Sequence, residues 1–394
     1  MQYSDSKRKE REIKIFNSYF SIEHPSILCM YEENDGIYFS NARYNGLFWL
    51  DKKSLHVSYI RDFPGEKTEG INLHRKVIRI NDDYYFLPHW GTGISVWKID
   101  TDEMLFFSSK DFLGGKWEYS SESFLLDDKI WIFPQSLDQP LIYFDVLKKE
   151  FTECGWWNEK IYELSGLKDG VMSIKSIICV NGKIYFVIVG KNYLFKMDTA
   201  SGNIDMFKLD KDDDPQTIAF IDNAFWFTSW QSNDIFTWDE STFEKVKYKD
   251  SVDRKNTNEK YVCSLVKYRN EIIGLPRLGK KPFHLDKAGN WCEFDFCPNN
   301  SERVHGLDNI WINPLFYVYY VRDDEKLCLL PYSLNGYYLY DGNKWSFFEL
   351  KMDMSSIPVN KILSSWINNI KGDSFYIEGK QFDVEDFIDM VTLM

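Results

Sequence analysis

Residues 173–209 constrain the fold most strongly, because they hold four short apolar runs separated by turns. The runs cover residues 177–180, 183–189, 193–197 and 204–209. Asn181-Gly182 suits a tight type I′ hairpin turn, and residues 198–203 are rich in turn formers. A four-stranded meander cannot bury both of its faces alone. It hides its apolar surface only against copies of itself, so a repeat of this unit predicts a propeller or a similar array.

The four-run unit recurs seven times along the chain of 394 residues, at residues 26–60, 76–108, 123–154, 173–209, 216–249, 261–296 and 317–350. An aspartate closes the third run of every copy: Asp51, Asp100, Asp145, Asp198, Asp239, Asp286 and Asp341. Successive aspartates lie 41 to 55 residues apart, which brackets the blade period of about 40 to 50 residues. Each is predicted to accept backbone N–H bonds in the turn that follows. The predicted fold is all-β, a seven-bladed β-propeller of four-stranded antiparallel blades.

The ends of the chain have their own predictions. Residues 1–25 are predicted to form an N-terminal arm with a closing strand at 13–20, residues 26–350 the propeller, and residues 351–394 a C-terminal extension. Val384, Phe387, Ile388 and Val391 have helical spacing and Asp383 can cap the first turn, so a short C-terminal amphipathic helix is expected. The alternative is an eighth, partial blade built from residues 13–20 and 374–378.

The charge and cysteine content narrow the partners and the compartment. The formal net charge is −13 and the one basic run, residues 7–9, is flanked by acids, which argues against nucleic-acid and anionic-membrane partners. The N-terminal dozen residues are charged and no apolar stretch approaches a membrane span. Seven scattered cysteines lack the spacing of a disulfide framework. We therefore expect a cytoplasmic protein with reduced cysteines.

Two segments carry a family resemblance. Residues 129–145 join a second strand of the KIYF type to an aromatic third strand that ends in aspartate, and residues 336–345 run from such a third strand to the tryptophan of the fourth strand. Both segments resemble Kelch-type propeller repeats. The resemblance covers about residues 26–350. The paired glycines that end the second strand of Kelch repeats are missing, and Pro88, Pro134, Gly190, Trp230, Pro276 or Pro331 stands there. The resemblance implies the fold and a tendency toward binding roles rather than a reaction.

Loop length indicates which side of the propeller is functional. Turns within the hairpins are tight, whereas the links between blades are long, at residues 61–75, 109–122, 155–173, 250–260 and 297–316. In a meander these links emerge on the same side as the corners between second and third strands. Long loops without regular structure are commonly functional, so the working surface is placed on this face. The alternative is that the links only cover the top of the ring.

The corners on that face supply the candidate ligand-binding residues Arg43, His89, Trp90, Gln135, Trp230, Gln231, Arg277 and Tyr332. Aromatic faces beside arginine, glutamine and histidine suit a sugar, a nucleotide-like ligand or a peptide. Packing under a loop is the competing explanation for any single tryptophan.

Sequence signatures of cofactor and metal chemistry are missing. The chain has no Walker A loop, dinucleotide fingerprint, zinc-binding cysteine pair or nucleophile elbow, and its six histidines are far apart. No cofactor and no metal are expected. The first functional hypothesis is a binding or scaffolding propeller for a protein, peptide or glycan. The second is an enzyme acting on a sugar or small polar metabolite in the central pocket of the same face, with a carboxylate pair drawn from Asp62, Glu66, Glu69, Glu118, Glu153 and Glu159.

Overall fold

A computed structural model describes residues 25–358 with gaps, together with residue 361 and residues 374–377 and 380–383. The gaps are residues 43, 69, 71, 111–119, 135–136, 138, 167–173, 189–190, 210–214, 230–234, 241, 247–261, 277–281, 286–290, 295–315 and 332–335. The predicted strand at 13–20 and the predicted helix at 383–393 lie outside this part of the chain, apart from Asp383, which ends a strand.

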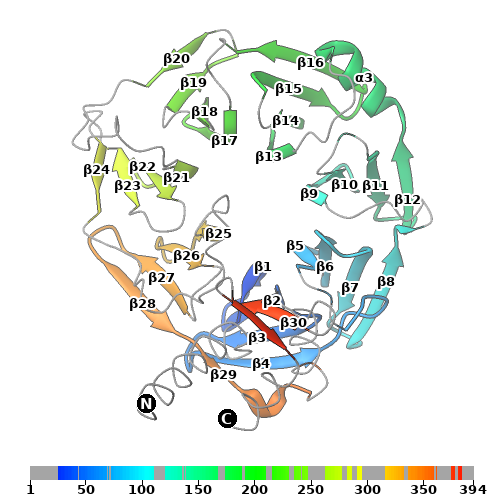
Figure 1. Ribbon diagram of the computed structural model, residues 1–394, viewed down its shortest axis with the longest axis vertical. Coiled ribbons are helices and arrows are strands. Elements are labelled where there is room, and N and C mark those ends of the chain that lie inside the picture. Colours follow the sequence, from blue (N-terminus) through cyan, green and yellow to red (C-terminus); the bar gives the residue numbers. More distant parts are fainter. Residues whose placement is uncertain are drawn as a thin grey trace. The chain divides into compact units, whose positions relative to one another are not determined.

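Seven sheets follow one another along the chain, each built from four consecutive strands, and the fold is a seven-bladed β-propeller (Figure 1). The first three contain β1 (Ile27–Glu32), β2 (Gly36–Asn41), β3 (Leu47–Asp51), β4 (His56–Arg61); β5 (His74–Ile80), β6 (Asp83–Pro88), β7 (Gly93–Lys98), β8 (Glu103–Ser108); β9 (Ser120–Leu126), β10 (Lys129–Pro134), β11 (Leu141–Asp145) and β12 (Glu150–Cys154). The middle two contain β13 (Ile174–Val180), β14 (Lys183–Ile188), β15 (Tyr193–Asp198), β16 (Asn203–Lys208); β17 (Pro215–Ile221), β18 (Ala224–Ser229), β19 (Ile235–Trp238) and β20 (Phe243–Lys245). The last two contain β21 (Val262–Tyr268), β22 (Glu271–Pro276), β23 (Phe283–Leu285), β24 (Trp291–Glu293); β25 (Phe316–Val321), β26 (Leu327–Pro331), β27 (Gly336–Tyr340) and β28 (Trp345–Glu349).

The burial of each strand follows its place in the blade. Second strands such as β6, β10 and β14 are buried along nearly their whole length, whereas the fourth strands β12 and β16 are mostly exposed. A middle strand is covered on both faces by the neighbouring blades, so its sequence is almost continuously apolar. The sequence pattern predicted this difference correctly.

The aspartate series has the predicted structural role in the five copies where the structure shows its turn bonds. One carboxylate oxygen, Oδ1, accepts backbone N–H bonds from the residues two and three positions on at Asp51, Asp145, Asp198 and Asp341, and from the residue three positions on at Asp239. The Lys183 ammonium and these turn bonds lower the pKa of Asp198 to about 2. Asp100 lies in the turn after β7, and Asp286 lies outside the described residues.

The fourth strand of the fifth blade begins earlier than predicted. The alternating sequence suggested a strand at residues 245–249, whereas β20 covers Phe243–Lys245, and residues 247–249 lie outside the described part of the chain. Phe243 pairs with Trp238 across the two strands and its ring stacks on the indole, with centroids 5.4 Å apart and an interplanar angle of 7°. This aromatic cross-strand pair stabilises the pairing of β19 with β20.

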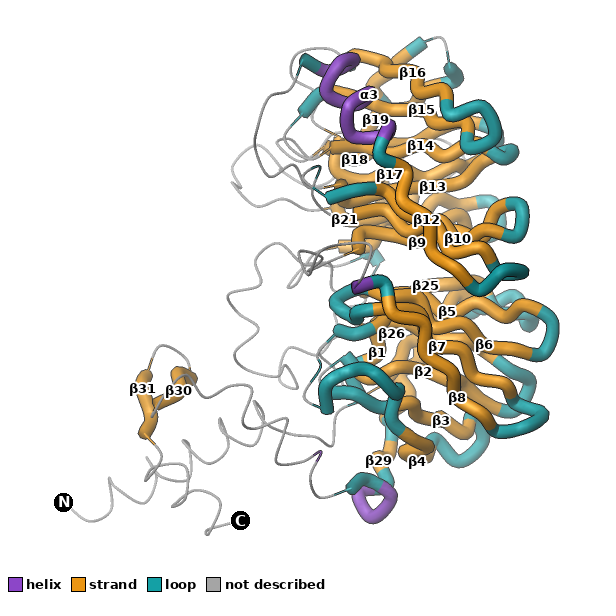
Figure 2. Tube along the Cα trace, turned by 90° about the vertical axis from the view of Figure 1, so that its right-hand side faces the viewer, coloured by secondary structure: helices purple, strands orange, loops and turns teal. Residues whose placement is uncertain are grey.

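The link at residues 155–173 was expected to lack regular structure, and this expectation was also wrong. It contains the helix α3 (Trp156–Ser165), which ends at Gly166 in the left-handed conformation with φ 64° (Figure 2). Trp157 and Ile161, one helical turn apart, are its buried residues. Because only two of its ten residues are buried, the helix leaves a weak periodic pattern of apolar residues in the sequence. Packing against the blades therefore accounts for this helix better than the local sequence pattern does.

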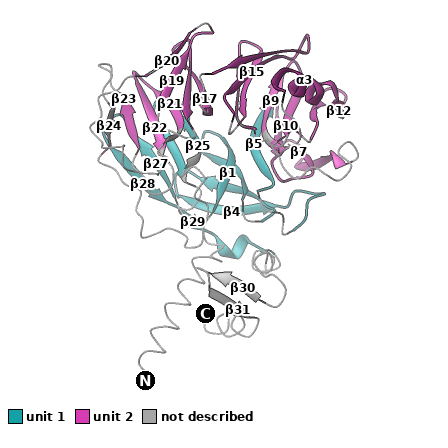
Figure 3. Cartoon of the chain, turned by 45° about the horizontal axis from the view of Figure 1, so that its top comes forward, with its two compact units in different colours: residues 1–79, 299–313, 317–394 teal, residues 80–298, 314–316 magenta. Residues whose placement is uncertain are grey.

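The chain divides into two compact units, coloured separately in Figure 3. Unit 1 comprises residues 1–79, 299–313 and 317–394, and one of its core clusters joins residues of the first and last blades, including Phe39, Phe48 and Leu330. Unit 2 comprises residues 80–298 and 314–316 and contains the clusters between the third and fourth, fourth and fifth, and fifth and sixth blades. The predicted limits of the arm, the propeller and the extension stay predictions.

Within unit 1, the segment after the last blade attaches to the first blade. Strand β29 (Lys351–Met352) pairs in parallel with β4 as a fifth strand, and the 3₁₀ helix η3 (Met354–Ser356) follows. The Ser356 hydroxyl oxygen accepts the Tyr59 N–H at 3.0 Å. Strands β30 (Ser374–Ile377) and β31 (Lys380–Asp383) pair with each other in a two-stranded sheet. The alternative partial blade stays a prediction, because residues 13–20 lie outside the described part of the chain.

An ion pair between Lys361 and Asp62 also connects the segment after the last blade to the rest of unit 1. The Lys361 ammonium, on a side chain that is 1% exposed, lies 2.7 Å from the Asp62 carboxylate, which also accepts the Tyr59 hydroxyl at 2.5 Å. The carboxylate side is 42% exposed, so water solvates one partner and the protein encloses the other. Replacing Asp62 and replacing Lys361 should therefore change the free energy of unfolding by different amounts.

Replacing Asp62 with alanine should lower the free energy of unfolding by about 2 kcal/mol, because it leaves a buried ammonium without a carboxylate. Lys361→Met removes the buried charge together with its need for a partner, and should cost less than half as much. Urea denaturation of the two single variants and the double variant measures the difference. Equal losses for Asp62→Ala and Lys361→Met would show that burial of the ammonium does not set the energy of this contact.

Candidate binding site at the β6–β7 corner

The structure describes two of the eight predicted ligand-binding residues, His89 and Trp90, which follow β6 in unit 2. The other six lie outside the described residues: Arg43, Gln135, Trp230, Gln231, Arg277 and Tyr332. The described part of the predicted site is therefore the corner between β6 and β7.

Three hydrogen bonds to a single residue, Ser120, hold the first half of this corner. The Ser120 N–H donates to the His89 carbonyl oxygen at 2.7 Å, and the Ser120 hydroxyl donates to the Pro88 carbonyl oxygen. The His89 ring returns a bond from Nδ1 to the Ser120 carbonyl oxygen at 2.7 Å. Ser120 is the first residue of β9, so the next blade fixes this corner. Nothing in the sequence pattern marked Ser120 for this role.

The second half of the corner is fixed by β8 and by Ser109, the residue that follows it. The backbone N–H and the hydroxyl of Ser109 both donate to the Thr92 carbonyl oxygen at 2.9 Å. Gly93 opens β7 so close to β8 that a Cβ atom there would lie 2.1 Å from the Phe107 carbonyl oxygen. Only glycine permits this approach of two backbones. Residues 88–93 are therefore held at both ends.

The side chains on this rigid corner offer an aromatic face and an imidazole. The Trp90 side chain is 36% exposed and its ring centroid lies 6.1 Å from that of His89, at an interplanar angle of 35°. Because a carbonyl oxygen only accepts, the His89 Nδ1 in contact with Ser120 must carry a proton, and Nε2 is the acceptor nitrogen of the neutral ring. Stacking and directed hydrogen bonding can thus act side by side.

Several other residues of the blade links are buried or bonded within the protein, which indicates a structural role. His74 is buried in unit 1, with Nδ1 2.9 Å from the Ser40 hydroxyl oxygen, and burial lowers its pKa to about 3. Trp157 is fully buried in the core, as the packing explanation for single tryptophans expected. Of the link carboxylates, Asp62 is bonded to Tyr59 and Lys361. Glu153 and Glu159 are exposed, and Glu69 and Glu118 lie outside the described residues.

The described residues form neither a membrane-spanning helix nor a cluster of metal ligands. No helix in this part of the chain is both long and apolar enough to cross a membrane. No three or more histidine, cysteine, aspartate or glutamate side chains of the described residues are grouped so as to hold a metal ion.

Comparisons with known proteins identify the fold class but no family. No protein family model matches the chain, and no curated protein matches it in sequence. A streptogramin B lyase structure is similar with a TM-score of 0.56 and 13% identity, over 79% of this chain and 93% of that one. A catalytically inactive virginiamycin B lyase from Staphylococcus aureus with quinupristin gives 0.51 and 17%, over 71% and 84%. A selenomethionine form of the lyase from the same organism gives 0.50 and 16%, over 70% and 83%.

At these identities the likeness concerns the fold alone. Together with the seven consecutive four-stranded sheets, it defines the class of the protein as a seven-bladed β-propeller. The function must be argued from the residues of the site.

Proposed function

We propose that the protein is a binding or scaffolding propeller that recognises a protein, peptide or glycan through the face that carries the β6–β7 corner. The observation that supports the proposal is the fixed corner itself. Bonds from Ser120 and Ser109 hold its backbone at both ends, while the Trp90 ring stays partly exposed beside an oriented imidazole. A preordered aromatic contact loses little conformational entropy on binding, which favours affinity.

Two further statements belong to this proposal. The likeness to Kelch-type repeats rests on the hairpins at residues 129–145 and 336–345 and agrees with a binding role. A cytoplasmic location without nucleic-acid or membrane partners agrees with the net charge of −13 and with free thiols at Cys29, Cys154, Cys292 and Cys328.

Trp90→Ala should weaken a genuine ligand by about 1 to 3 kcal/mol, or roughly 5- to 150-fold, with no change in Tm, because the lost indole is a partly exposed contact. Ligands are first selected with wild-type protein on a glycan array and from a displayed peptide library. Titration calorimetry with the selected ligand then compares the wild-type protein with the variant.

Ile99→Ala is the matched control for this experiment. Ile99 is 37% exposed, belongs to the same blade, and lies in the turn between β7 and β8 at the opposite end of the strands. Its replacement should leave affinity unchanged. If every selected ligand binds Trp90→Ala normally, or if Ile99→Ala causes the same loss, the corner is not the recognition surface.

A further inference from the structure

The first and last blades meet without sharing a strand. The first blade takes its four strands from β1 to β4 and the last blade takes its four from β25 to β28, so each blade is continuous in sequence. The two blades pack together in a core cluster of unit 1, in which Phe39 and Phe48 lie with Leu330 and Tyr337. We call this packed boundary the seam. Contacts between side chains form the seam, and neither blade contributes a strand to the sheet of the other.

The chain that follows the last blade crosses to the outer edge of the first blade. We call residues 351–358 and 361 of this chain the strap. Its first part, β29, is the fifth strand of the first sheet and lies beside β4 (Figure 1). The Lys351 N–H donates to the Leu55 carbonyl oxygen at 2.9 Å. The Asp353 N–H donates to the Val57 carbonyl oxygen at 2.8 Å. The strap therefore adds main-chain pairing to the contact between the two ends of the propeller.

Three side chains anchor the rest of the strap. The Ser356 hydroxyl oxygen accepts the Tyr59 N–H at 3.0 Å, and the Lys361 ammonium lies 2.7 Å from the Asp62 carboxylate. Ile357 is 4% exposed and belongs to the core cluster of the seam, where it joins side chains of both blades. The contacts follow β4 in order, from the residue before its start to the residue after its end. The strap thus lies along the whole of β4 and reaches into the seam.

Fewer contacts hold the strap than hold a strand inside the sheet. β29 pairs with β4 through two residues, whereas β2 pairs through five residues with β1 and through five with β3. The strap has one buried apolar side chain among its described residues, Ile357, and the Asp62 side chain that receives its ammonium is 42% exposed. Segments with few buried apolar contacts and solvated hydrogen bonds open at a lower free energy than the core of a fold.

We propose that the strap is a detachable closure of the propeller. It binds across the seam and detaches as one unit while the blades stay folded, and its detachment is the step that allows the seam to open. Ile357 is the anchor on which the closure depends, because it is the buried side chain that joins the strap to the seam. The closure goes beyond the proposed function, because it concerns the first and last blades and not the β6–β7 corner.

Hydrogen exchange of the full chain, measured by mass spectrometry, tests whether the strap detaches alone. In the wild-type protein, peptides that cover residues 351–358 should be protected, yet exchange at least about tenfold faster than peptides of β2 and β3. Ile357→Ala should speed exchange in the strap by at least about 30-fold, because it removes a buried isoleucine. Ser356→Ala is a milder change that removes the acceptor of the Tyr59 N–H, and should speed exchange there by about fivefold.

Ile204→Ala is the matched control in unit 2. Ile204 is 5% exposed in β16, so its replacement is as severe as that of Ile357. It should speed exchange in β13 to β16 by at least about 30-fold. It should leave exchange in the strap unchanged, because a strap that detaches from a folded protein is insensitive to the stability of unit 2.

Thiol labelling tests whether the seam opens. Cys328 is 1% exposed and belongs to the core cluster of the seam, so iodoacetamide reaches it only when the seam opens. Its alkylation rate at a fixed pH should rise at least about tenfold in Ile357→Ala and stay unchanged in Ile204→Ala. Cys154, which is 5% exposed in the core of unit 2, is the internal standard and should react faster in Ile204→Ala.

Each contrary outcome overturns the closure. Strap peptides of the wild-type protein that exchange as slowly as β2 and β3, or with no protection, rule out a bound segment that detaches alone. Equal acceleration of the strap and of β16 in Ile204→Ala means that the strap opens only when the protein unfolds. An unchanged alkylation rate of Cys328 in Ile357→Ala means that the strap does not close the seam. These measurements need no ligand, so they are independent of the test at the β6–β7 corner.

Discussion

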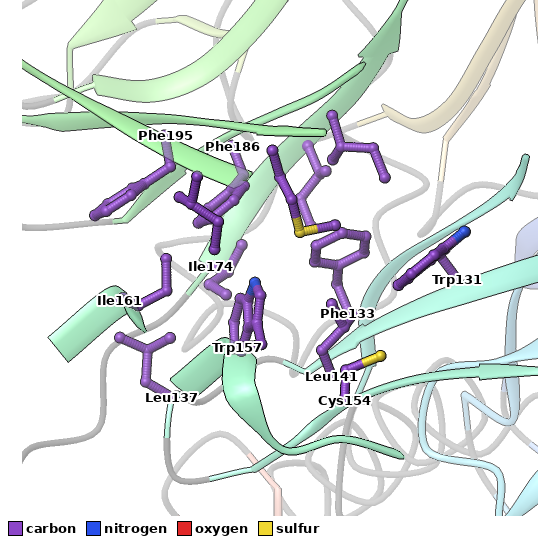
Figure 4. Packing of buried hydrophobic residues seen from close by; sticks show 14 of the residues in the cluster. Trp131, Phe133, Leu137, Leu141, Cys154, Trp157, Ile161, Ile174, Phe186 and Phe195 are labelled. Carbon is purple, nitrogen blue, oxygen red and sulfur yellow. The ribbon is translucent and has the colours of Figure 1, made fainter. Parts of the chain in front are cut away.

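Trp157→Ala is expected to lower the free energy of unfolding by about 3 to 5 kcal/mol, because it opens a large cavity in the core of unit 2. The fully buried indole lies among Ile161, Ile174 and Phe133 (Figure 4). Its ring centroid is 6.0 Å from that of Phe186, which in turn stacks on Phe195 with centroids 5.0 Å apart. Loss of the indole removes the largest buried side chain that packs α3 against the third and fourth blades. Urea denaturation followed by far-UV circular dichroism measures the loss.

Trp157→Phe separates packing from hydrogen bonding at the same position. The indole Nε1 is buried and donates to no atom of the described residues, so phenylalanine removes an unsatisfied donor while it keeps most of the apolar volume. We expect this variant to lose less than about 1.5 kcal/mol. A loss as large as that of the alanine variant would mean that Nε1 has a partner in solution and that the indole is held by more than packing.

Acidification from pH 6.5 to 4.5 should destabilise the protein by about 2 to 3 kcal/mol through His74 alone. Burial lowers the pKa of this imidazole to about 3 in the folded protein, against 6.5 when it is unfolded. Between these values the unfolded chain binds a proton that the folded chain does not, so stability is complete above pH 6.5. It then declines as the pH falls toward 3, by at most about 1.4 kcal/mol per pH unit.

The described carboxylates with lowered pKa values contribute mainly at more acidic pH. The lowered pKa values of Asp51, Asp145 and Asp198 contribute stability that is lost mainly below about pH 4, and that of Glu240 begins to be lost near the acidic end of the window. Urea denaturation at half-unit pH steps should therefore show a slope between pH 6.5 and 4.5 that His74→Asn removes. His56→Gln, at an exposed position at the start of β4, is the matched control and should keep the slope. A slope that survives His74→Asn would assign the effect to other groups.

The sequence alone determined the blade count and the strand order, because both depend on signals that lie close together in the chain. Alternation of apolar residues and the turn dipeptides act within one hairpin. The recurring aspartates mark equivalent turns because each carboxylate bonds to N–H groups only two or three residues away, as at Asp51, Asp145 and Asp198. The position of His89 and Trp90 in the corner after β6 was predicted in the same way, from polar and aromatic residues directly after a buried strand, and their role in binding stays a prediction.

Contacts between residues that are distant in the chain were decided only by the tertiary structure. Ser120 orients His89 from 31 positions away, and Lys361 meets Asp62 across almost 300 residues. His74 and Trp157 read as loop residues but are buried, because the blades beside them supply the enclosing surface. A β-bulge at Gln216 in β17 leaves no mark in the sequence, since an extra residue in one strand becomes visible only when its partner strand is in place.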